Sequence, residues 1–326
     1  MTKRGGSNEQ HVTPPMNAPA APAATVTHAP WRRLALPLLL LLAMGIAWGG
    51  SFSLLRIARF DGASGFGLAF WEGFGSGIPV LLLLLLTRGR FPLDPRSLRF
   101  YALSGLLGIT IPASALFVAA LFLPAGIVAM SNALVPIATY GFTLAIRLER
   151  FAMLRALGLV AGLIGVLLVL MPEASLPEPG MAQWALLCFA ATIAYGAQNV
   201  YVARAAPQGM SALAMSAGTL LGGGLLILPL VLATGGFLSL LPPWQAAQFA
   251  AIGMMTINAC GTVGFLWLIR TAGPVFTSQC AYLVVLFGML WGILIFGESH
   301  SGWIWAALVL MIAGVLLVSL RQRKAP

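Results

Sequence analysis

The side chains best suited to bind a solute are amides, hydroxyls and aromatic rings set within long apolar stretches. Those in the same stretch are three, four or eight positions apart, which places them on one face of a helix. They are Trp48 and Ser51; Thr110 and Ser114; Asn132 and Tyr140; Tyr195, Gln198 and Asn199; Asn258 and Thr262; and Ser278 and Tyr282. We expect them to line a central cavity, where amides and hydroxyls orient a small solute and the rings cover its apolar part.

A structural role is the alternative for each of these residues. Ser, Thr, Asn and Gln side chains commonly hydrogen-bond across membrane helices, for about 0.6 kcal/mol each. Taken singly, each residue fits that role as well as it fits a cavity. Polar groups that come from six stretches and lie near the middle of most of them favour a shared cavity.

Glu72 is the one acidic residue inside an apolar stretch. It lies six residues into the stretch that begins at residue 66, or about 9 Å along a helix at 1.5 Å per residue. The functional interpretation is a proton-coupling or cation-coupling site. The structural alternative is that Glu72 reaches the nearer membrane surface or pairs with Arg56 or Arg59, because charges inside membranes usually pair. The shallow depth favours the structural alternative.

The composition is that of a membrane protein, and few residues of the kinds used in catalysis lie in the apolar stretches. Of its 326 residues, 60% are apolar and 8% are charged, whereas soluble domains carry about 25% charged residues. The three cysteines show no CxxC spacing, and the three histidines all lie outside the apolar stretches. No Walker motif is present. We therefore expect no catalytic residues, no metal site and no cofactor, and we do not expect an enzyme.

Ten apolar stretches of 19 to 24 residues follow one another along the chain. About 20 residues are needed to cross a ~30 Å hydrocarbon core, so the chain is predicted to be an all-α integral membrane protein with ten transmembrane helices. The stretches are 34–55, 66–87, 99–121, 124–146, 153–171, 183–203, 210–233, 247–269, 274–296 and 302–320. Residues 1–31 are predicted to form a disordered cytoplasmic tail, and residues 321–326 a basic cytoplasmic end. The first stretch is too long for a cleaved signal peptide.

The basic residues predict the orientation. With the N-terminus in the cytoplasm and loops on alternate sides, 16 of the 18 Lys and Arg residues face the cytoplasm. Only Arg56 and Arg59 fall on the outer side. The net charge of +10 is therefore a topology signal and gives no reason to expect nucleic acid. Both termini are predicted to be cytoplasmic, in the inner membrane if the protein is bacterial.

Fragments of the first half recur in the second half in the same order. Ile46-Ala47-Trp48-Gly49 recurs 147 residues later as Ile193-Ala194-Tyr195-Gly196. Glu149 recurs as Glu298, and the run 165–169 as 314–318, both at an offset of 149 residues. The fragments indicate two five-helix repeats, residues 32–171 and 183–320. Because five is odd, the second repeat must enter the membrane inverted, an arrangement typical of secondary transporters with a site between the halves.

Several short motifs recur in a fixed order along these stretches. They are Ala47-Trp48-Gly49-Gly50-Ser51-Phe52, Pro136, Leu148-Glu149-Arg150, Gly158, Gly165-Val166, Gly297-Glu298 and Gly314-Val315. This order of features resembles the ten-helix EamA-type members of the drug/metabolite transporter superfamily. The resemblance covers about residues 34–320 and implies two inverted EamA repeats around a central cavity, with transport of small metabolites such as amino acids. Trp71-Glu72 departs from the pattern, since many relatives have an arginine there, and no counterpart of Pro136 stands at Val285.

The leading hypothesis is a secondary transporter that exports small metabolites or related amphipathic compounds by alternating access. A passive channel or structural membrane protein is the alternative, and a membrane-embedded lipid-modifying enzyme is a weaker one. The expected partners are a small-molecule substrate and the bilayer; monomer and homodimer remain open. Pro136, in the middle of its helix, is interpreted as a structural kink, with a gating hinge as the alternative. Gly158, Gly162 and other glycines are expected where helices pack closely.

Overall fold

The computed structural model describes residues 30–119, 132–170, 182–297 and 303–319, and every regular element in these ranges is helical. Within these described ranges seven runs, among them Ala35–Phe60 and Ala246–Ala272, are long and apolar enough to cross a membrane, and shorter apolar helices accompany them. The prediction of an all-α membrane protein is confirmed. The predicted tail, the basic end and Glu298 lie outside the described residues, apart from the first residues of α1.

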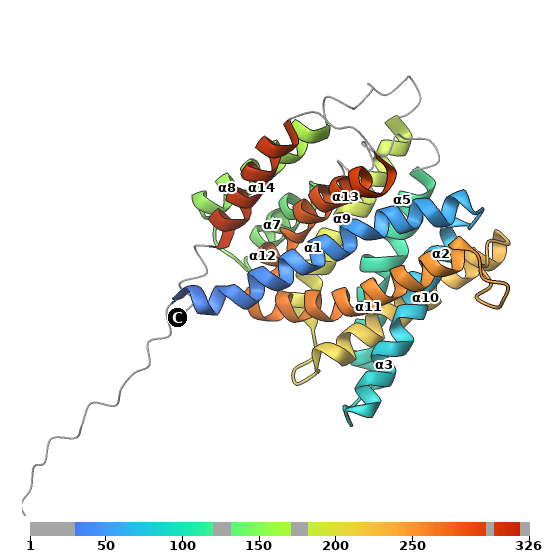
Figure 1. Ribbon diagram of the computed structural model, residues 1–326. Coiled ribbons are helices and arrows are strands. Elements are labelled where there is room, and N and C mark those ends of the chain that lie inside the picture. The colour runs from blue at the N-terminus through green and yellow to red at the C-terminus, as the bar shows by residue number, and fades with distance from the viewer. Residues whose placement is uncertain (1–29, 120–131, 171–181, 298–302, 320–326) are drawn as a thin grey trace, which may run out of the picture.

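The helical segments follow the ten predicted stretches in order (Figure 1). Some stretches are divided into two or three elements. The elements are α1 (Pro30–Phe60), α2 (Gly65–Phe70), η1 (Trp71–Gly75), α3 (Ser76–Leu86), α4 (Pro95–Gly105), η2 (Leu106–Thr110), α5 (Ile111–Ala119), α7 (Val135–Ala145), α8 (Met153–Leu170), α9 (Ala182–Ala205), α10 (Ala212–Ala233), α11 (Ala246–Ala272), α12 (Pro274–Ser278), α13 (Cys280–Phe296) and α14 (Trp303–Ser319).

Side chains in the loops define where several helices begin. Asp94 caps α4 by accepting hydrogen bonds from the Ser97 backbone N–H (3.1 Å) and hydroxyl (2.7 Å), with Pro95 in the first turn. Ser211 caps α10 in the same way. At α11 the Asp61 carboxylate accepts a hydrogen bond of 2.8 Å from the Ala247 N–H. Each bond satisfies an N–H that the first turn of a helix leaves unpaired.

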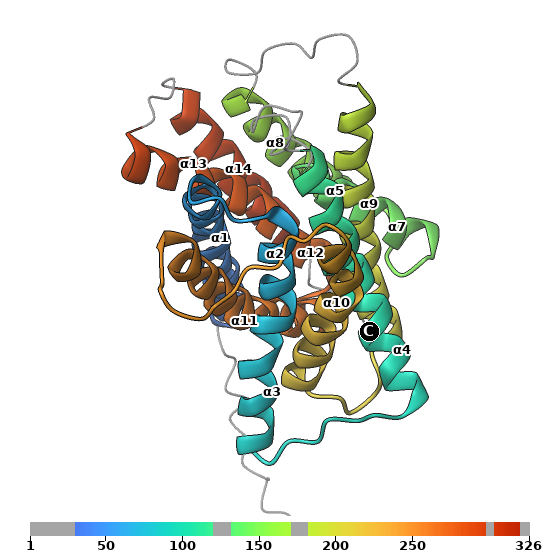
Figure 2. The ribbon, with the colours of Figure 1, turned by 90° about the vertical axis from the view of Figure 1, so that its right-hand side faces the viewer.

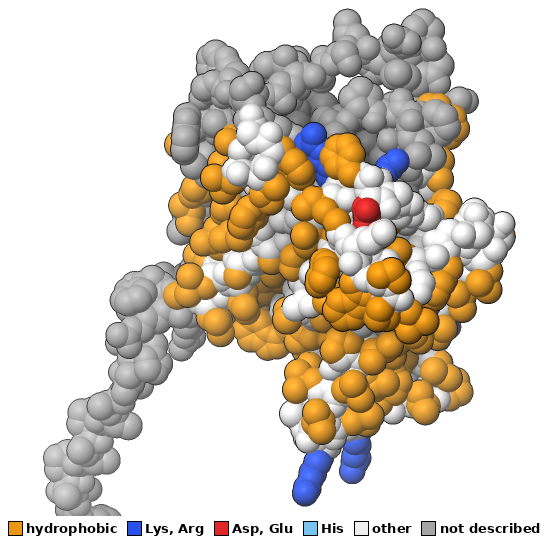
Figure 3. Space-filling view, turned by 45° about the vertical axis from the view of Figure 1, so that its right-hand side comes forward, with side chains coloured by type: hydrophobic (Ala, Val, Ile, Leu, Met, Phe, Trp, Pro, Cys, Tyr) orange, Lys and Arg blue, Asp and Glu red, His pale blue; other side chains and the backbone are white. Residues whose placement is uncertain are grey.

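The outer surface is apolar around the helices. Leu82, Leu86 and Leu294 are among many large apolar side chains that lie exposed. The face in Figure 3 shows a broad hydrophobic area, with basic side chains near its upper and lower edges. Exposed apolar area on this scale marks contact with lipid.

Glycines let several helix pairs approach closely. Gly158 of α8 and Gly314 of α14 face each other, and a Cβ at Gly158 would lie 2.8 Å from the Gly314 carbonyl oxygen. Helix α10 lies between α3 and α4 (Figure 2). There Gly224 meets Gly73 of η1, and a Cβ at Gly73 would lie 3.0 Å from the Gly224 Cα. Small residues at helix contacts are the usual packing device in membranes.

Two departures from regular α-helix concern the predicted stretches. The second and third stretches each contain a π-helix, η1 and η2. Pro136 was predicted in the middle of a helix, but it stands in the first turn of α7, after a turn at Ala133 and Leu134. There its missing N–H costs little, so Pro136 begins a helix and does not kink one.

Candidate solute-binding site

An interior polar cluster brings together Trp48, Glu72, Tyr195, Asn258 and Thr262. Its centre is a hydrogen-bonded chain between the two halves of the sequence. Asn258 of α11 donates from Nδ2 to the Glu72 carbonyl oxygen of η1 at 2.7 Å. Thr262, one turn further along α11, donates to Asn258 Oδ1 at 3.2 Å. Asn258 is thus fixed against the second span, and Thr262 bonds it on the same face of α11, as their four-residue spacing predicted.

The π-helix η1 explains why the Glu72 carbonyl can accept this bond. At the end of η1 the Ser76 N–H reaches the Trp71 carbonyl, five residues earlier. The Glu72 carbonyl accepts from the Ser76 hydroxyl at 2.5 Å and from Asn258. Single π-turns within α-helices occur frequently at functional sites, because they redirect backbone groups toward a neighbour.

The carboxylate of Glu72 has no hydrogen bond or ion pair to another residue of the described ranges. Its interaction across the cluster is electrostatic, with Tyr195 of α9. The expected pairing with Arg56 or Arg59 is not found. Arg56 is exposed, and its guanidinium carbon lies 4.2 Å from the centroid of the Phe296 ring and 5.6 Å from that of Phe60. Glu72 is therefore a partly buried acid without a counter-ion from the described part of the chain.

Aromatic rings border the cluster. The Trp48 ring of α1 packs edge-on against Phe265, with centroids 5.5 Å apart. Its indole also lies against Gly261, where a Cβ would meet Trp48 Cε2 at 2.8 Å. Gly261 immediately precedes Thr262, so the indole sits beside the polar face of α11. Tyr195 is half-buried and forms no hydrogen bond with the rest of the described chain. These two rings provide apolar surface next to the polar groups.

Other predicted site residues use their polar groups to join helices. Asn199 donates to Thr139 Oγ1 at 3.0 Å, and Gln198 donates to the Ser104 carbonyl at 3.3 Å. Tyr282 is fully buried and donates to the Leu159 carbonyl at 2.8 Å. Tyr140 accepts from the Ala152 N–H at 2.8 Å. These contacts match the structural alternative raised from the sequence.

The remaining predicted residues differ in whether their side chains have a hydrogen-bond partner. Thr110 donates to the Gly223 carbonyl at 2.9 Å, and Ser278 to the Val275 carbonyl within its own turn at 2.8 Å. The Ser51 hydroxyl is buried and has no partner among the described residues. Ser114 and Asn132 are half-buried. In the described ranges, no hydrogen bond joins these five residues to the interior polar cluster.

Some interior polar residues lie outside the predicted cavity lining. Thr219 donates to Ser104 Oγ at 3.0 Å, so α10 and α4 share a buried polar contact. Gln279 is fully buried at the junction of α12 and α13, and its Oε1 has no partner in the described part of the chain. Gln279 stands 147 residues after Asn132, the same offset as the first repeated fragment. Its spacing from Tyr282 already placed it one helical turn away, and this offset also makes it the counterpart of Asn132 in the second repeat.

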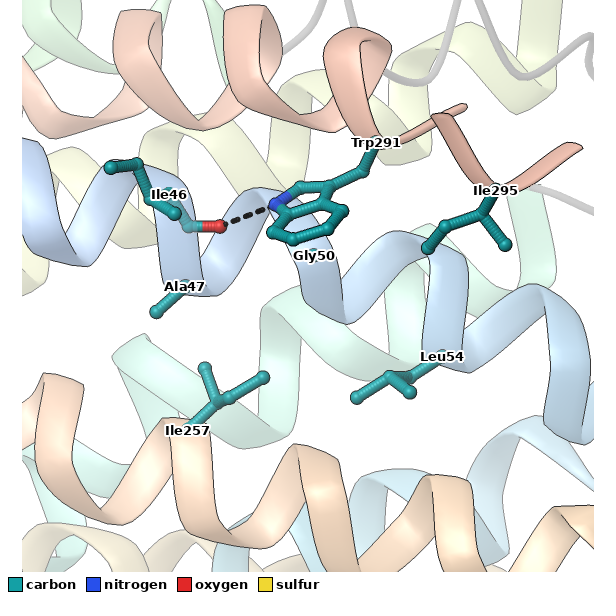
Figure 4. Close-up of a pocket in the computed structure, with 7 residues that line it drawn as sticks. All are labelled: Ile46, Ala47, Gly50, Leu54, Ile257, Trp291 and Ile295. Carbon is teal, nitrogen blue, oxygen red and sulfur yellow. Dashed lines mark hydrogen bonds between the residues drawn. The ribbon is translucent and has the colours of Figure 1, made fainter. Parts of the chain in front are cut away.

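A surface groove of about 230 Å³ lies between α1, α11 and α13 (Figure 4). Trp291 closes one wall by donating from Nε1 to the Ile46 carbonyl at 3.0 Å. Its lining is apolar and contains none of the predicted site residues, so the groove lacks the groups needed to orient a polar solute. The lining residues are Ile46, Ala47, Gly50, Leu54, Ile257, Trp291 and Ile295. In the described ranges no group of acidic, histidine or cysteine side chains could hold a metal ion.

Comparison with solved structures supports the fold. One crystal structure superposes on this chain with a TM-score of 0.67, over 89% of this chain and 99% of that chain. The sequence identity is 16%, so this likeness concerns the fold alone.

Comparison with known sequences gives the family. The chain is 28% identical over 290 residues to the uncharacterized inner membrane transporter YedA of Escherichia coli (strain K12), covering 88% of this chain and 91% of that protein. YedA of the O157:H7 strain matches to the same extent. The model of the EamA-like transporter family matches twice, over residues 35–171 and 182–320. With both halves matched, the chain belongs to the EamA-like transporter family and is a membrane transporter built from two EamA repeats.

Proposed function

We propose that this transporter exports small metabolites, such as amino acids or related amphipathic compounds, by alternating access. The observation that carries the proposal is the bond between Asn258 and Glu72, because it places interior polar groups where the two repeats meet. In transporters built from inverted repeats, solute sites lie near the midplane at the repeat interface.

The interior polar cluster has the chemistry for an amphipathic solute. The Asn258 amide and Thr262 hydroxyl would orient its polar end, while Trp48 and Tyr195 would cover its apolar part. Glu72 is the candidate coupling residue, since it is an acid with no counter-ion in the described chain. The wider lining that we propose includes Ser51, Thr110, Ser114 and Asn132. Tyr140, Gln198, Asn199, Ser278 and Tyr282 would support it by holding helices in place.

The proposed orientation has both termini in the cytoplasm. Contacts between loops support the alternation of sides on which it rests. Asp61 bonds Ala247, and Trp71 donates to the Leu238 carbonyl at 2.7 Å, so the loops after the first and seventh spans share one side. Arg270 donates to the Met210 carbonyl, which joins the loops after the sixth and eighth spans. The basic residues favour the cytoplasm for that second set.

Untargeted profiling of the metabolites released by cells with and without the protein tests export. We expect one or a few small metabolites to accumulate outside cells that carry it. An unchanged set of released metabolites, with the protein correctly inserted, would contradict the proposal.

Exchange across vesicles separates alternating access from a passive channel. For a solute found by profiling, unlabelled solute on the far side should accelerate release of labelled solute from vesicles that contain the protein. A channel would show no such acceleration, because its two sides are open together.

A further inference from the structure

We infer that the loop between α10 and α11, residues 234–245, is a gate that covers the interior polar cluster from one side, and that Trp71 holds this gate shut. The inference rests on the proposed function, because it names the part of the chain that must move before a solute can pass on that side. It is drawn from the hydrogen bond of Trp71, the apolar side chains that the loop inserts between the spans and the exposure of the rest of the loop.

The loop fills the space between the spans that also form the interior polar cluster. The side chains of Leu238 and Leu240 pack against a buried group made of Ala58 of α1, Leu68 of α2 and three alanines of α11. Asn258 lies 12 residues into α11, or about 18 Å from the start of that helix at 1.5 Å per residue. The apolar side chains of the loop therefore lie between the cluster and the nearer end of these spans.

Trp71 bonds the loop to the second span. Its indole Nε1 donates to the Leu238 carbonyl at 2.7 Å, and the centroid of its ring lies 5.8 Å from that of Phe237. Trp71 is the first residue of η1, and the carbonyl of the next residue, Glu72, accepts a hydrogen bond of 2.7 Å from Asn258. Adjacent residues thus hold the loop and the interior polar cluster, so a movement of η1 affects both.

The rest of the loop is exposed, and several of its hydrogen bonds are local. Leu241 and Trp244 are 75% and 50% exposed. Trp244 donates to the Leu240 carbonyl at 2.9 Å, and Gln248 in the first turn of α11 donates to the Ser239 carbonyl at 3.2 Å. Segments with few buried apolar contacts open at a low free energy. The loop can therefore keep its own shape while it lifts away from the second span.

Access to the interior polar cluster can be measured before the solute is known. The probe is a membrane-impermeant maleimide, and its target is Thr262→Cys in full-length protein in sealed vesicles, with the three native cysteines replaced. A cysteine at Gly62 identifies the gate side, because the loops after α1 and α10 share one side. From that side, Trp71→Phe should raise the rate of labelling at position 262 roughly threefold or more, since it removes one hydrogen bond that closes the gate and keeps an aromatic ring.

Two further variants assign the effect to the gate. Leu240→Ala shortens a side chain that the loop inserts between the spans, so it should also raise labelling of Thr262→Cys from the gate side. Trp244→Phe is the matched control, because the indole bond that it removes stays within the loop, and the rate should not change. Neither Trp71→Phe nor Leu240→Ala should raise labelling from the opposite side. If Trp71→Phe does not fold, as judged by size-exclusion chromatography, Leu240→Ala decides the question.

Two results would overturn the inference. One is gate-side labelling that stays unchanged in Trp71→Phe or, if that variant does not fold, in Leu240→Ala. The other is an equal increase in labelling from both sides, which would show a general loosening of the fold. Metabolite profiling is scored separately: export with unchanged gate-side labelling would refute only the gate. Gate-side labelling that depends on Trp71 without any released metabolite would refute only export.

Discussion

At the scale of single residues, Asn258 and Asn199 are two interior amides with different surroundings. Asn258 is half-buried in the interior polar cluster, and Asn199 is 1% exposed and bonds Thr139 between α9 and α7. We expect Asn258→Ala to lose most transport at nearly normal abundance, because one cross-helix bond is worth only about 0.6 kcal/mol. Asn199→Ala should lower abundance and transport together, because the Asn199 side chain is fully buried and its removal leaves a cavity between α9 and α7.

Transport per molecule checks this contrast. Uptake into vesicles, divided by the amount of folded protein from fluorescence-detected chromatography, should fall for Asn258→Ala and stay near the wild-type value for Asn199→Ala. Parallel losses of abundance and transport in both variants would show that Asn258, too, serves only to hold helices together.

Asp94 supports a pH prediction outside the membrane. The Ser97 hydroxyl and then the Ser97 backbone N–H hold the pKa of the Asp94 carboxyl below its ordinary value. A lowered pKa in the folded state means that the charged cap stabilises the protein above the ordinary Asp pKa of about 3.9. This contribution is lost as the pH falls through the folded value, and solvent screening keeps it small because Asp94 is exposed.

Thermal unfolding at several pH values measures the cap. We expect the Tm difference between wild type and Asp94→Ala to be constant above about pH 5 and to shrink in stronger acid. Asp94→Asn should stay close to wild type at neutral pH, since Asn caps helices about as well as Asp. A difference that grows on acidification would contradict the assignment.

At the scale of elements, glycines decide how closely helices pack. Gly158 and Gly314 hold α8 against α14, and a Cβ at Gly158 would also meet Val318 Cγ2 at 2.8 Å. We expect Gly158→Ala to destabilise the protein by about 1–3 kcal/mol, the usual cost of overpacking. Gly141→Ala on α7 is the control, because a Cβ there has no atom within 4 Å.

Thermal stability in detergent separates the two glycine variants. Gly158→Ala should lower the Tm, whereas Gly141→Ala should leave it unchanged or raise it slightly, because alanine favours helix over glycine by up to about 1 kcal/mol. Equal effects of the two changes would mean that helix propensity, and not close packing, governs these positions.

The π-helices differ between the two repeats. Spans two and three contain η1 and η2, while their counterparts α10 and α11 are regular throughout. Both π-helices pack against glycines of α10. Gly224 lies against Gly73 of η1, and the Gly223 carbonyl accepts a hydrogen bond from Thr110 of η2. The π-helices of the first repeat therefore pack against α10, a regular α-helix of the second repeat.

At the scale of the whole molecule, inverted repeats predict opposite sides for equivalent residues. Single cysteines would be placed at Glu149 and Glu298 after Cys188, Cys260 and Cys280 are replaced. We expect a membrane-impermeant maleimide to label position 298 from outside intact cells, and position 149 only after the membrane is opened. The Glu149 carboxylate lies near Gly273, where a Cβ would be 3.7 Å from Oε1, so a cysteine at 273 should behave like one at 149.

Labelling of positions 149 and 298 from the same side would refute the inverted arrangement. A cysteine at Asp61 would serve as the outside reference, although its carboxylate caps α11 and its removal is expected to lower abundance somewhat. Position 62 is a second reference, since a Cβ at Gly62 meets no atom within 4 Å.

Much of the fold could be predicted because the insertion of each helix into the membrane depends on that helix alone. The free energy of moving a segment from water to lipid depends on its own length and composition, so apolar stretches mark the helices. The number of basic residues in each loop indicates on which side of the membrane that loop lies. The recurrence of Ile46–Gly49 as Ile193–Gly196 indicated the repeats without any contact being known. Helix breaks were the exception, because a π-turn and the turn before Pro136 depend on what packs against them.

Which polar groups meet was decided only by the tertiary structure. Helical spacing placed Asn199 and Asn258 on polar faces, but it could not show that one bonds Thr139, 60 residues away, and the other bonds Glu72, 186 residues away. Nor could the sequence show that Arg56 does not pair with Glu72, because this depends on the direction of the Arg56 side chain. The Arg56 guanidinium lies over the Phe296 ring. Periodicity determines the face on which a side chain lies; its partner depends on angstrom-scale distances between helices, which arise only when the whole bundle packs.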